Sequence, residues 1–183
     1  MSNNNKIESL KEKLKQALTS TAKVISDDFD LKNNEKKNDS FIKSEIFQIE
    51  NLNSKKDLIK ARAEFDSLAL KKKFSNDKIY KKNLPLNSSC RSLYSIAEKI
   101  RYESLGSKML KGIEKNLKEN YNQVLSQKKK DQLKTKDDVL VNEAFELYML
   151  KKFHGLNLNQ LSNEILSFWE KDFDQVIEKH IDY

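Results

Sequence analysis

The sequence predicts a mostly α-helical, soluble domain, and three observations support this. Apolar residues recur every three or four positions through most of the chain, which is the spacing of the buried face of an amphipathic helix. Residues with helix-capping side chains stand at the ends of several of these segments. Because 183 residues is the length of one domain, we expect residues 1–183 to form a single helical domain of about five helices.

The first expected helix covers residues 6–25. Its apolar stripe consists of Ile7, Leu10, Leu14, Ala17 and Leu18. The periodicity is lost in residues 27–54, where a tract rich in lysine and asparagine is followed by alternating apolar residues. We therefore expect residues 27–54 to form an irregular arm or a short β-hairpin.

The second expected helix runs from about residue 55 to residue 74, and Arg62 falls within its apolar stripe. On this basis we expect Arg62 to point toward the core. A buried cation needs a partner because removing an unpaired charge from water is costly, and Asp66 lies one helical turn further along. Pro85, the only proline, interrupts the helical pattern before the next segment.

The third expected helix begins at a Ser88 or Ser89 cap and continues to about residue 125. The apolar residues of its first and second halves lie on nearly opposite sides at 100° per residue. Such a helix either crosses the domain with different partners at each end or kinks at Gly106. Gly106 and Gly112 each cost about 1 kcal/mol in a helix interior relative to alanine, so we interpret both as close-packing positions.

A fourth helix is expected after a cap at Asp137 or Asp138, with Gly155 at its end, and a fifth is expected from about Asn159. The fifth has a strong apolar stripe that we expect to anchor the core. This stripe consists of Leu161, Ile165, Phe168, Trp169, Phe173, Val176 and Ile177.

The composition disfavours a membrane or secreted protein. No apolar run is long enough to span a bilayer, and the single cysteine, Cys90, cannot form an internal disulfide, so the cytoplasm is the expected compartment. The net charge of +7 would suit a nucleic-acid partner. The lysines, however, alternate with acidic residues, which favours a solvated surface over a phosphate-binding one.

The sequence predicts no catalytic site, metal site or cofactor in this chain. It contains no glycine-rich phosphate loop and no histidines or cysteines at the spacing of metal ligands. We interpret His154 as interacting with the dipole at a helix end and Cys90 as a small buried apolar residue. These features indicate a binding module without enzymatic activity of its own.

The three arginines, Arg62, Arg91 and Arg101, occur among 32 lysines and lie within 40 residues of one another. A guanidinium group can hold a carboxylate or phosphate with two parallel hydrogen bonds, which an ammonium group cannot, so we expect these arginines to have specific partners. Arg101 and Glu103 are two positions apart and cannot face each other on a helix. Each is therefore expected to find a partner in another helix or another subunit.

Two blocks of sequence resemble a known family. The first is Arg-Ala-Glu-Phe-Asp-Ser-Leu-Ala-Leu at residues 62–70, and the second is Arg-Tyr-Glu-Ser-Leu-Gly-Ser-Lys-Met-Leu-Lys-Gly-Ile-Glu-Lys-Asn-Leu at residues 101–117. Both are similar to the amino-terminal region of the T subunit of the aerobic, ATP-dependent cobaltochelatase, the CobT family. Members of that family continue into an acidic linker and a von Willebrand factor A-like domain with an Asp-x-Ser-x-Ser metal-binding motif. Nothing in this sequence matches that motif, so we expect the chain to correspond to the amino-terminal domain alone.

The resemblance implies a role in aerobic cobalamin biosynthesis. The T subunit associates with an AAA+ ATPase, the S subunit, and this assembly drives the large N subunit, which inserts Co²⁺ into hydrogenobyrinic acid a,c-diamide. ATP, Mg²⁺ and cobalt would then belong to the whole complex and none of them to this chain. The implied function is that of a non-catalytic interaction domain within a cobaltochelatase, a ligase that forms nitrogen–metal bonds.

Two alternatives stay open at this point. The chain could be a generic helical scaffold or adaptor, in which case the two matching blocks would be accidental, or a basic nucleic-acid-binding helical protein. The sequence offers five candidate partner-binding or structural polar side chains. They are Arg62, Asp66, Arg91, Arg101 and Glu103.

Overall fold

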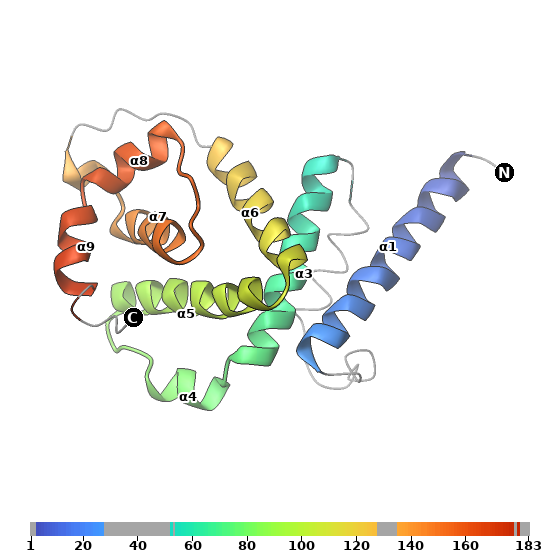
Figure 1. Ribbon diagram of the computed structural model, residues 1–183, viewed down its shortest axis with the longest axis horizontal. Coiled ribbons are helices and arrows are strands. Elements are labelled where there is room, and N and C mark those ends of the chain that lie inside the picture. Colours follow the sequence, from blue (N-terminus) through green and yellow to red (C-terminus); the bar gives the residue numbers. More distant parts are fainter. Residues whose placement is uncertain (1–2, 28–51, 53, 128–134, 178, 180–183) are drawn as a thin grey trace.

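The computed structural model describes residues 3–27, 52, 54–127, 135–177 and 179, and all regular structure within these residues is helical (Figure 1). The α-helices are α1 (Asn3–Ser26), α3 (Lys55–Phe74), α4 (Asp77–Lys82), α5 (Ser88–Met109), α6 (Lys111–Ser126), α7 (Val141–Phe153), α8 (Gln160–Ser167) and α9 (Glu170–Ile177). A 3-10 helix, η1 (Lys136–Asp138), precedes α7. The prediction of a mostly helical protein is confirmed.

The described residues contain eight α-helices rather than five. One additional helix, α4, lies between the second and third expected helices. The other two arise because the third and fifth expected helices are each divided in two. Residues 28–51 and 53 lie outside the described part of the chain, and the expected arm or hairpin falls almost entirely on them.

The third expected helix is interrupted at Leu110, not at Gly106. Leu110 has extended backbone angles (φ −135°, ψ 109°) and is at once the C-cap of α5 and the N-cap of α6. The chain changes direction there, and Ile113 and Leu117 of α6 become buried. Of the apolar residues in the second half of the expected helix, Ile113 and Leu117 thus reach the core through α6, whereas Leu105 and Met109 stay on α5 and are exposed.

Two of the expected caps are displaced. Asn87 caps α5 in place of Ser88 or Ser89, because its side-chain oxygen accepts hydrogen bonds from the backbone of the first turn. Asp137 and Asp138 lie in η1 and do not cap α7.

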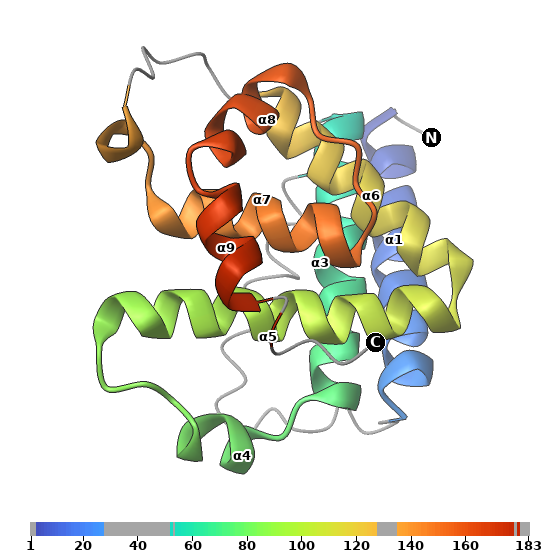
Figure 2. The same ribbon diagram turned by 60° about the vertical axis from the view of Figure 1, so that its left-hand side comes forward.

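Helix α5 lies at the centre of the arrangement and contacts α3, α6 and α7. On one side, α3 also contacts α6 and carries α1 on its outer surface. On the other side, α5 and α7 lie next to each other and α9 packs against α7 together with α8 (Figure 2). The main apolar core is therefore built from helices that are distant in sequence.

The α8–α9 segment closes the core on the α7 side. Trp169 lies between these two helices, and its ring stacks on Phe173 with 6.1 Å between centroids. The Lys136 ammonium group of η1 lies 4.0 Å from the centroid of the Trp169 ring, a cation–π contact. These contacts connect η1, α8 and α9 at one corner.

Only one of the two candidate close-packing glycines lies in a close contact. A Cβ atom at Gly106 would lie 2.2 Å from Leu70 Cδ2 of α3, and Leu70 is itself buried. At Gly112 a Cβ atom would meet nothing within 4 Å, so the interpretation of Gly112 as a close-packing position is wrong. The absence of a side chain at Gly106 allows α3 and α5 to cross closely.

We expect Gly106→Ala to lower the free energy of unfolding by about 1–3 kcal/mol, because the added methyl group must displace Leu70 in a packed core. Gly112→Ala is the matched control. It should raise the free energy of unfolding by at most about 1 kcal/mol, because alanine is the better helix former and has open space there. Urea denaturation followed by circular dichroism measures both, and equal stability of the two variants would contradict the close crossing at Gly106.

Candidate functional site

Arg101 joins the carboxyl end of α3 to the middle of α5. Its Nε and Nη2 atoms donate hydrogen bonds to the two carboxylate oxygens of Glu98, at 2.7 and 2.9 Å, and Nη2 also donates to the backbone oxygen of Phe74 at 2.7 Å. Phe74 is the last residue of α3, so its carbonyl oxygen accepts no hydrogen bond from a backbone N–H of that helix. The guanidinium therefore holds a carboxylate of its own helix bidentately, and its partner in another helix is the Phe74 carbonyl of α3.

Glu98 is the acidic half of this contact. Its side chain also accepts a hydrogen bond from the Ser75 hydroxyl at 2.6 Å, so α5 is bonded to the residue that follows α3. The hydrogen bond from Arg101 is the main cause that holds the pKa of Glu98 below its usual value. Glu98 is therefore ionised at neutral pH and serves as the anchor of Arg101.

Glu103 is buried at the meeting point of three helices. The side chain is 1% exposed, and its two oxygens accept hydrogen bonds from Ser67 of α3 at 2.5 Å and from Tyr121 of α6 at 2.6 Å. Burial raises the pKa of Glu103, because the charged form loses its hydration. Its partners come from two other helices, and this group ties α5 to both.

His154, the residue after α7, lies beside Glu103. Its Nε2 atom is 3.8 Å from Glu103 Oε2, and its side chain is also 1% exposed. Burial, followed by the positive charges of Lys118 and Lys99, lowers the pKa of His154 to about 4. His154 is the C-cap of α7, as expected of a residue at a helix end, but its imidazole is neutral at pH 7 and so brings no positive charge to the helix dipole.

Asp66 and Arg62 do not form the expected buried ion pair. Asp66 is buried and accepts a hydrogen bond from the Asn116 amide of α6 at 2.7 Å. Arg62 lies on the exposed side of α3. Arg62 is exposed although its neighbours Ala61 and Ala63 are both buried. Burial raises the pKa of Asp66, and the positive charge of Arg62 acts to lower it without a buried contact.

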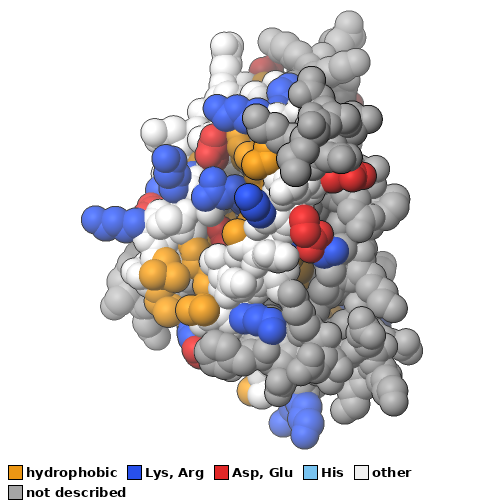
Figure 3. All heavy atoms as spheres, turned by 90° about the vertical axis from the view of Figure 1, so that its right-hand side faces the viewer, with side chains coloured by type: hydrophobic (Ala, Val, Ile, Leu, Met, Phe, Trp, Pro, Cys, Tyr) orange, Lys and Arg blue, Asp and Glu red, His pale blue; other side chains and the backbone are white. Residues whose placement is uncertain are grey.

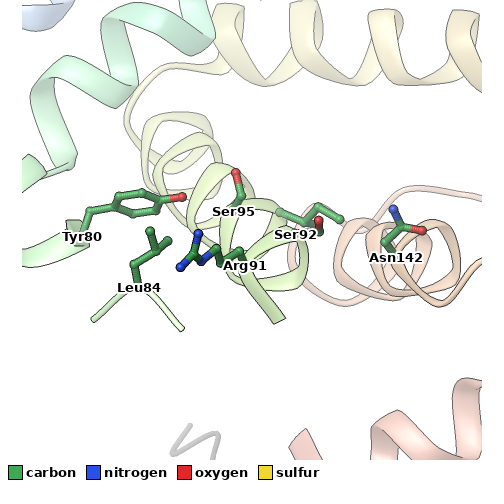
Figure 4. A pocket seen from close by; sticks show the side chains of 7 residues that line it. Tyr80, Leu84, Arg91, Ser92, Ser95 and Asn142 are labelled. Atoms are coloured by element: carbon green, nitrogen blue, oxygen red, sulfur yellow. The ribbon is translucent and has the colours of Figure 1, made fainter. Parts of the chain in front are cut away.

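Arg91 lies in an open pocket of about 520 Å³ between α4, the first turns of α5 and the start of α7 (Figure 4). The lining residues are Tyr80, Leu84, Arg91, Ser92, Ser95, Ile96 and Asn142. Arg91 Nε donates a hydrogen bond to the backbone oxygen of Pro85 at 2.7 Å. The neighbouring Cys90 is exposed, so its interpretation as a buried apolar residue is wrong.

The sequence analysis did not identify Glu98, Ser75, Ser67, Asn116 or Tyr121 as partners in these contacts, and it did not place His154 beside Glu103. Ser67 and Asn116 lie inside the two family-like blocks. A polar residue in such a buried segment needs a hydrogen-bond partner, so both could have been identified from the sequence as candidates for a buried contact. Tyr121 and His154 carry no such signal, because nothing in their spacing relates them to Glu103.

The charged side chains are dispersed on the face that carries α1. There, lysine and arginine side chains stand among acidic, apolar and uncharged ones (Figure 3).

Within the described residues no three histidine, cysteine or acidic side chains are grouped so that they could hold a metal ion. None of the helices in the described part of the chain combines the length and the apolar character needed to cross a membrane.

The fold and the contacts described above can be set beside a comparison with protein families. A family model described as cobalamin biosynthesis protein CobT matches residues 8–183. The chain belongs to the CobT family. This confirms the resemblance drawn from residues 62–70 and 101–117, and it assigns the chain to cobalamin biosynthesis. Comparisons with curated proteins and with solved structures gave no match.

We expect Arg101→Lys in this CobT-family chain to lower the free energy of unfolding by about 1 kcal/mol, since an ammonium group cannot hold Glu98 bidentately and bond Phe74 O as well. Arg62→Lys, on the exposed side of α3, is the control and should change stability by less than about 0.5 kcal/mol. Thermal and urea unfolding measure both. If Arg101→Lys unfolds like the unmodified chain, Arg101 does not fasten α3 to α5.

His154 should make stability depend on pH. Its pKa is lowered in the fold, so the stability it contributes is present above its unfolded value of 6.5 and is lost as the pH falls toward 4. Relative to His154→Phe, the unmodified chain should lose up to about 3 kcal/mol of unfolding free energy between pH 6.5 and pH 4. Urea unfolding of both proteins at several pH values tests this, and parallel pH profiles would show that His154 is not held neutral.

Proposed function

We propose that this chain is a non-catalytic interaction domain of the T subunit of ATP-dependent cobaltochelatase. In this role it docks the AAA+ ATPase S subunit and supports the large N subunit, which inserts Co²⁺ into hydrogenobyrinic acid a,c-diamide. The observation that carries the proposal is the CobT family match over residues 8–183. ATP and Mg²⁺ would be bound by the ATPase, while Co²⁺ and the tetrapyrrole are substrates of the large subunit.

The use of the polar residues in the two family-like blocks supports an interaction role. Arg101 bonds the end of α3, Glu103 bonds Ser67 and Tyr121, and Asp66 bonds Asn116. These side chains are occupied in holding α3, α5 and α6 together. They fix the relative positions of these helices, which suits a domain that presents a rigid surface to other subunits.

Reconstitution with the S and N subunits tests the proposal. We expect the purified chain to co-elute with the S subunit in size-exclusion chromatography and to show neither ATP hydrolysis nor cobalt insertion when assayed alone. An unrelated AAA+ ATPase is the control and should elute separately. Turnover by the chain alone, or its failure to bind either subunit, would contradict the proposal.

A further inference from the structure

We propose that the surface formed by α4, residues 83–87 and the first two turns of α5 binds an acidic, leucine-containing segment of a partner protein, with one carboxylate held by Arg91. We call this the α4–α5 surface. The inference goes beyond the proposed function, because it names a surface and the chemistry of its partner whether or not that partner is the ATPase subunit.

The charge of the α4–α5 surface is strongly positive. Residues 77–91 contain four cations and a single acidic residue, Asp77, and so carry a net charge of +3 out of the +7 of the whole chain. The four cations are Lys78, Lys81, Lys82 and Arg91, and all are exposed. None of them forms an ion pair with an acidic residue in the described part of the chain, whereas Lys118 and Lys151 elsewhere pair with Glu114 and Glu170. A concentrated positive charge without anions of its own complements an acidic partner.

Arg91 is positioned to hold a carboxylate. Its Nε atom is occupied by the Pro85 carbonyl at 2.7 Å, which orients the guanidinium, and no other hydrogen bond joins it to the described residues. In Figure 4 the guanidinium points toward Leu84 and the hydroxyl end of Tyr80, with Ser95 on the next turn of α5. Its two Nη groups can therefore donate to a ligand in the pocket, and the serine hydroxyl adds a further polar group near it.

Apolar side chains beside these cations indicate a protein segment rather than a nucleic acid. Leu86 is 94% exposed and Ile79 is 58% exposed, and Leu84 and Ile96 line the pocket itself. Covering Leu86 and Ile79 would remove apolar surface from water, which a leucine can do and a phosphate backbone cannot. Tyr80 is already stacked on Tyr94, with centroids 5.1 Å apart, so one face of its ring is closed to a nucleobase.

A designed peptide tests the inference on the complete chain. The probe is a short fluorescein-labelled peptide of glutamates with leucines at helical spacing, and fluorescence anisotropy gives its Kd. We expect Arg91→Gln to weaken binding about tenfold, which corresponds to the loss of charge-assisted hydrogen bonds. Arg91→Lys should weaken it severalfold despite the retained charge, because the bidentate geometry is lost.

Charge-matched controls separate a specific surface from general attraction. The double variant Lys81→Gln/Lys82→Gln removes two charges from the α4–α5 surface and should weaken binding by about fivefold. The double variant Lys108→Gln/Lys115→Gln removes two exposed charges from the distant α5–α6 turn and should change Kd by less than about twofold. Circular dichroism establishes that each variant is folded.

Three results would overturn the inference. They are equal weakening in the two double variants, equal binding of a peptide with glutamine in place of glutamate, and tighter binding of a single-stranded DNA of the same charge. A negative result leaves the proposed function standing, because that function is tested by binding to the S and N subunits. Conversely, failure to bind those subunits would leave peptide binding through Arg91 intact.

Discussion

The buried carboxylate of Glu103 determines how three helices meet. It belongs to α5, accepts hydrogen bonds from Ser67 of α3 and Tyr121 of α6, and lies 3.8 Å from His154 after α7. A carboxyl group removed from water is costly unless its oxygens are hydrogen-bonded. Both hydrogen bonds exist only when α3 and α6 hold their positions on α5 together, so a displacement of either helix leaves a polar group unsatisfied in the interior.

The same part of α5 fixes α3 at two further points. Arg101 bonds the last carbonyl of α3, and Gly106 admits the Leu70 side chain. A guanidinium–carbonyl hydrogen bond, a buried carboxylate hydrogen bond and a close steric fit thus lie within six residues of one helix. This combination specifies both the distance and the angle of the crossing, and it fixes the point from which the chain leaves α3 toward α4. The orientation of the α4–α5 surface is therefore determined from within the core.

The helical segments were largely predicted from local features of the sequence, whereas two of the caps and most features that depend on tertiary contacts were not. The helix at residues 55–74 was predicted with its observed bounds because its apolar stripe is a local feature of the sequence. The exposed position of Arg62 and the extended backbone of Leu110 follow from how neighbouring helices pack, which periodicity does not show. Gly106 and Gly112 looked equivalent in sequence, and only the position of Leu70 distinguishes them. For the site, the blocks at 62–70 and 101–117 indicated the family, but not the partners Tyr121 and His154.

Trp169, between α8 and α9, is the only tryptophan of the chain. Its ring is stacked on Phe173 and lies against the Lys136 ammonium group, so its surroundings depend on η1, α8 and α9 at once. Indole emission is sensitive to solvent, and a loosening of this corner would shift it to longer wavelength. The protein thus carries a built-in fluorophore that reports on the α7 side of the core without any label, at a corner well separated in sequence from the contacts of Glu103.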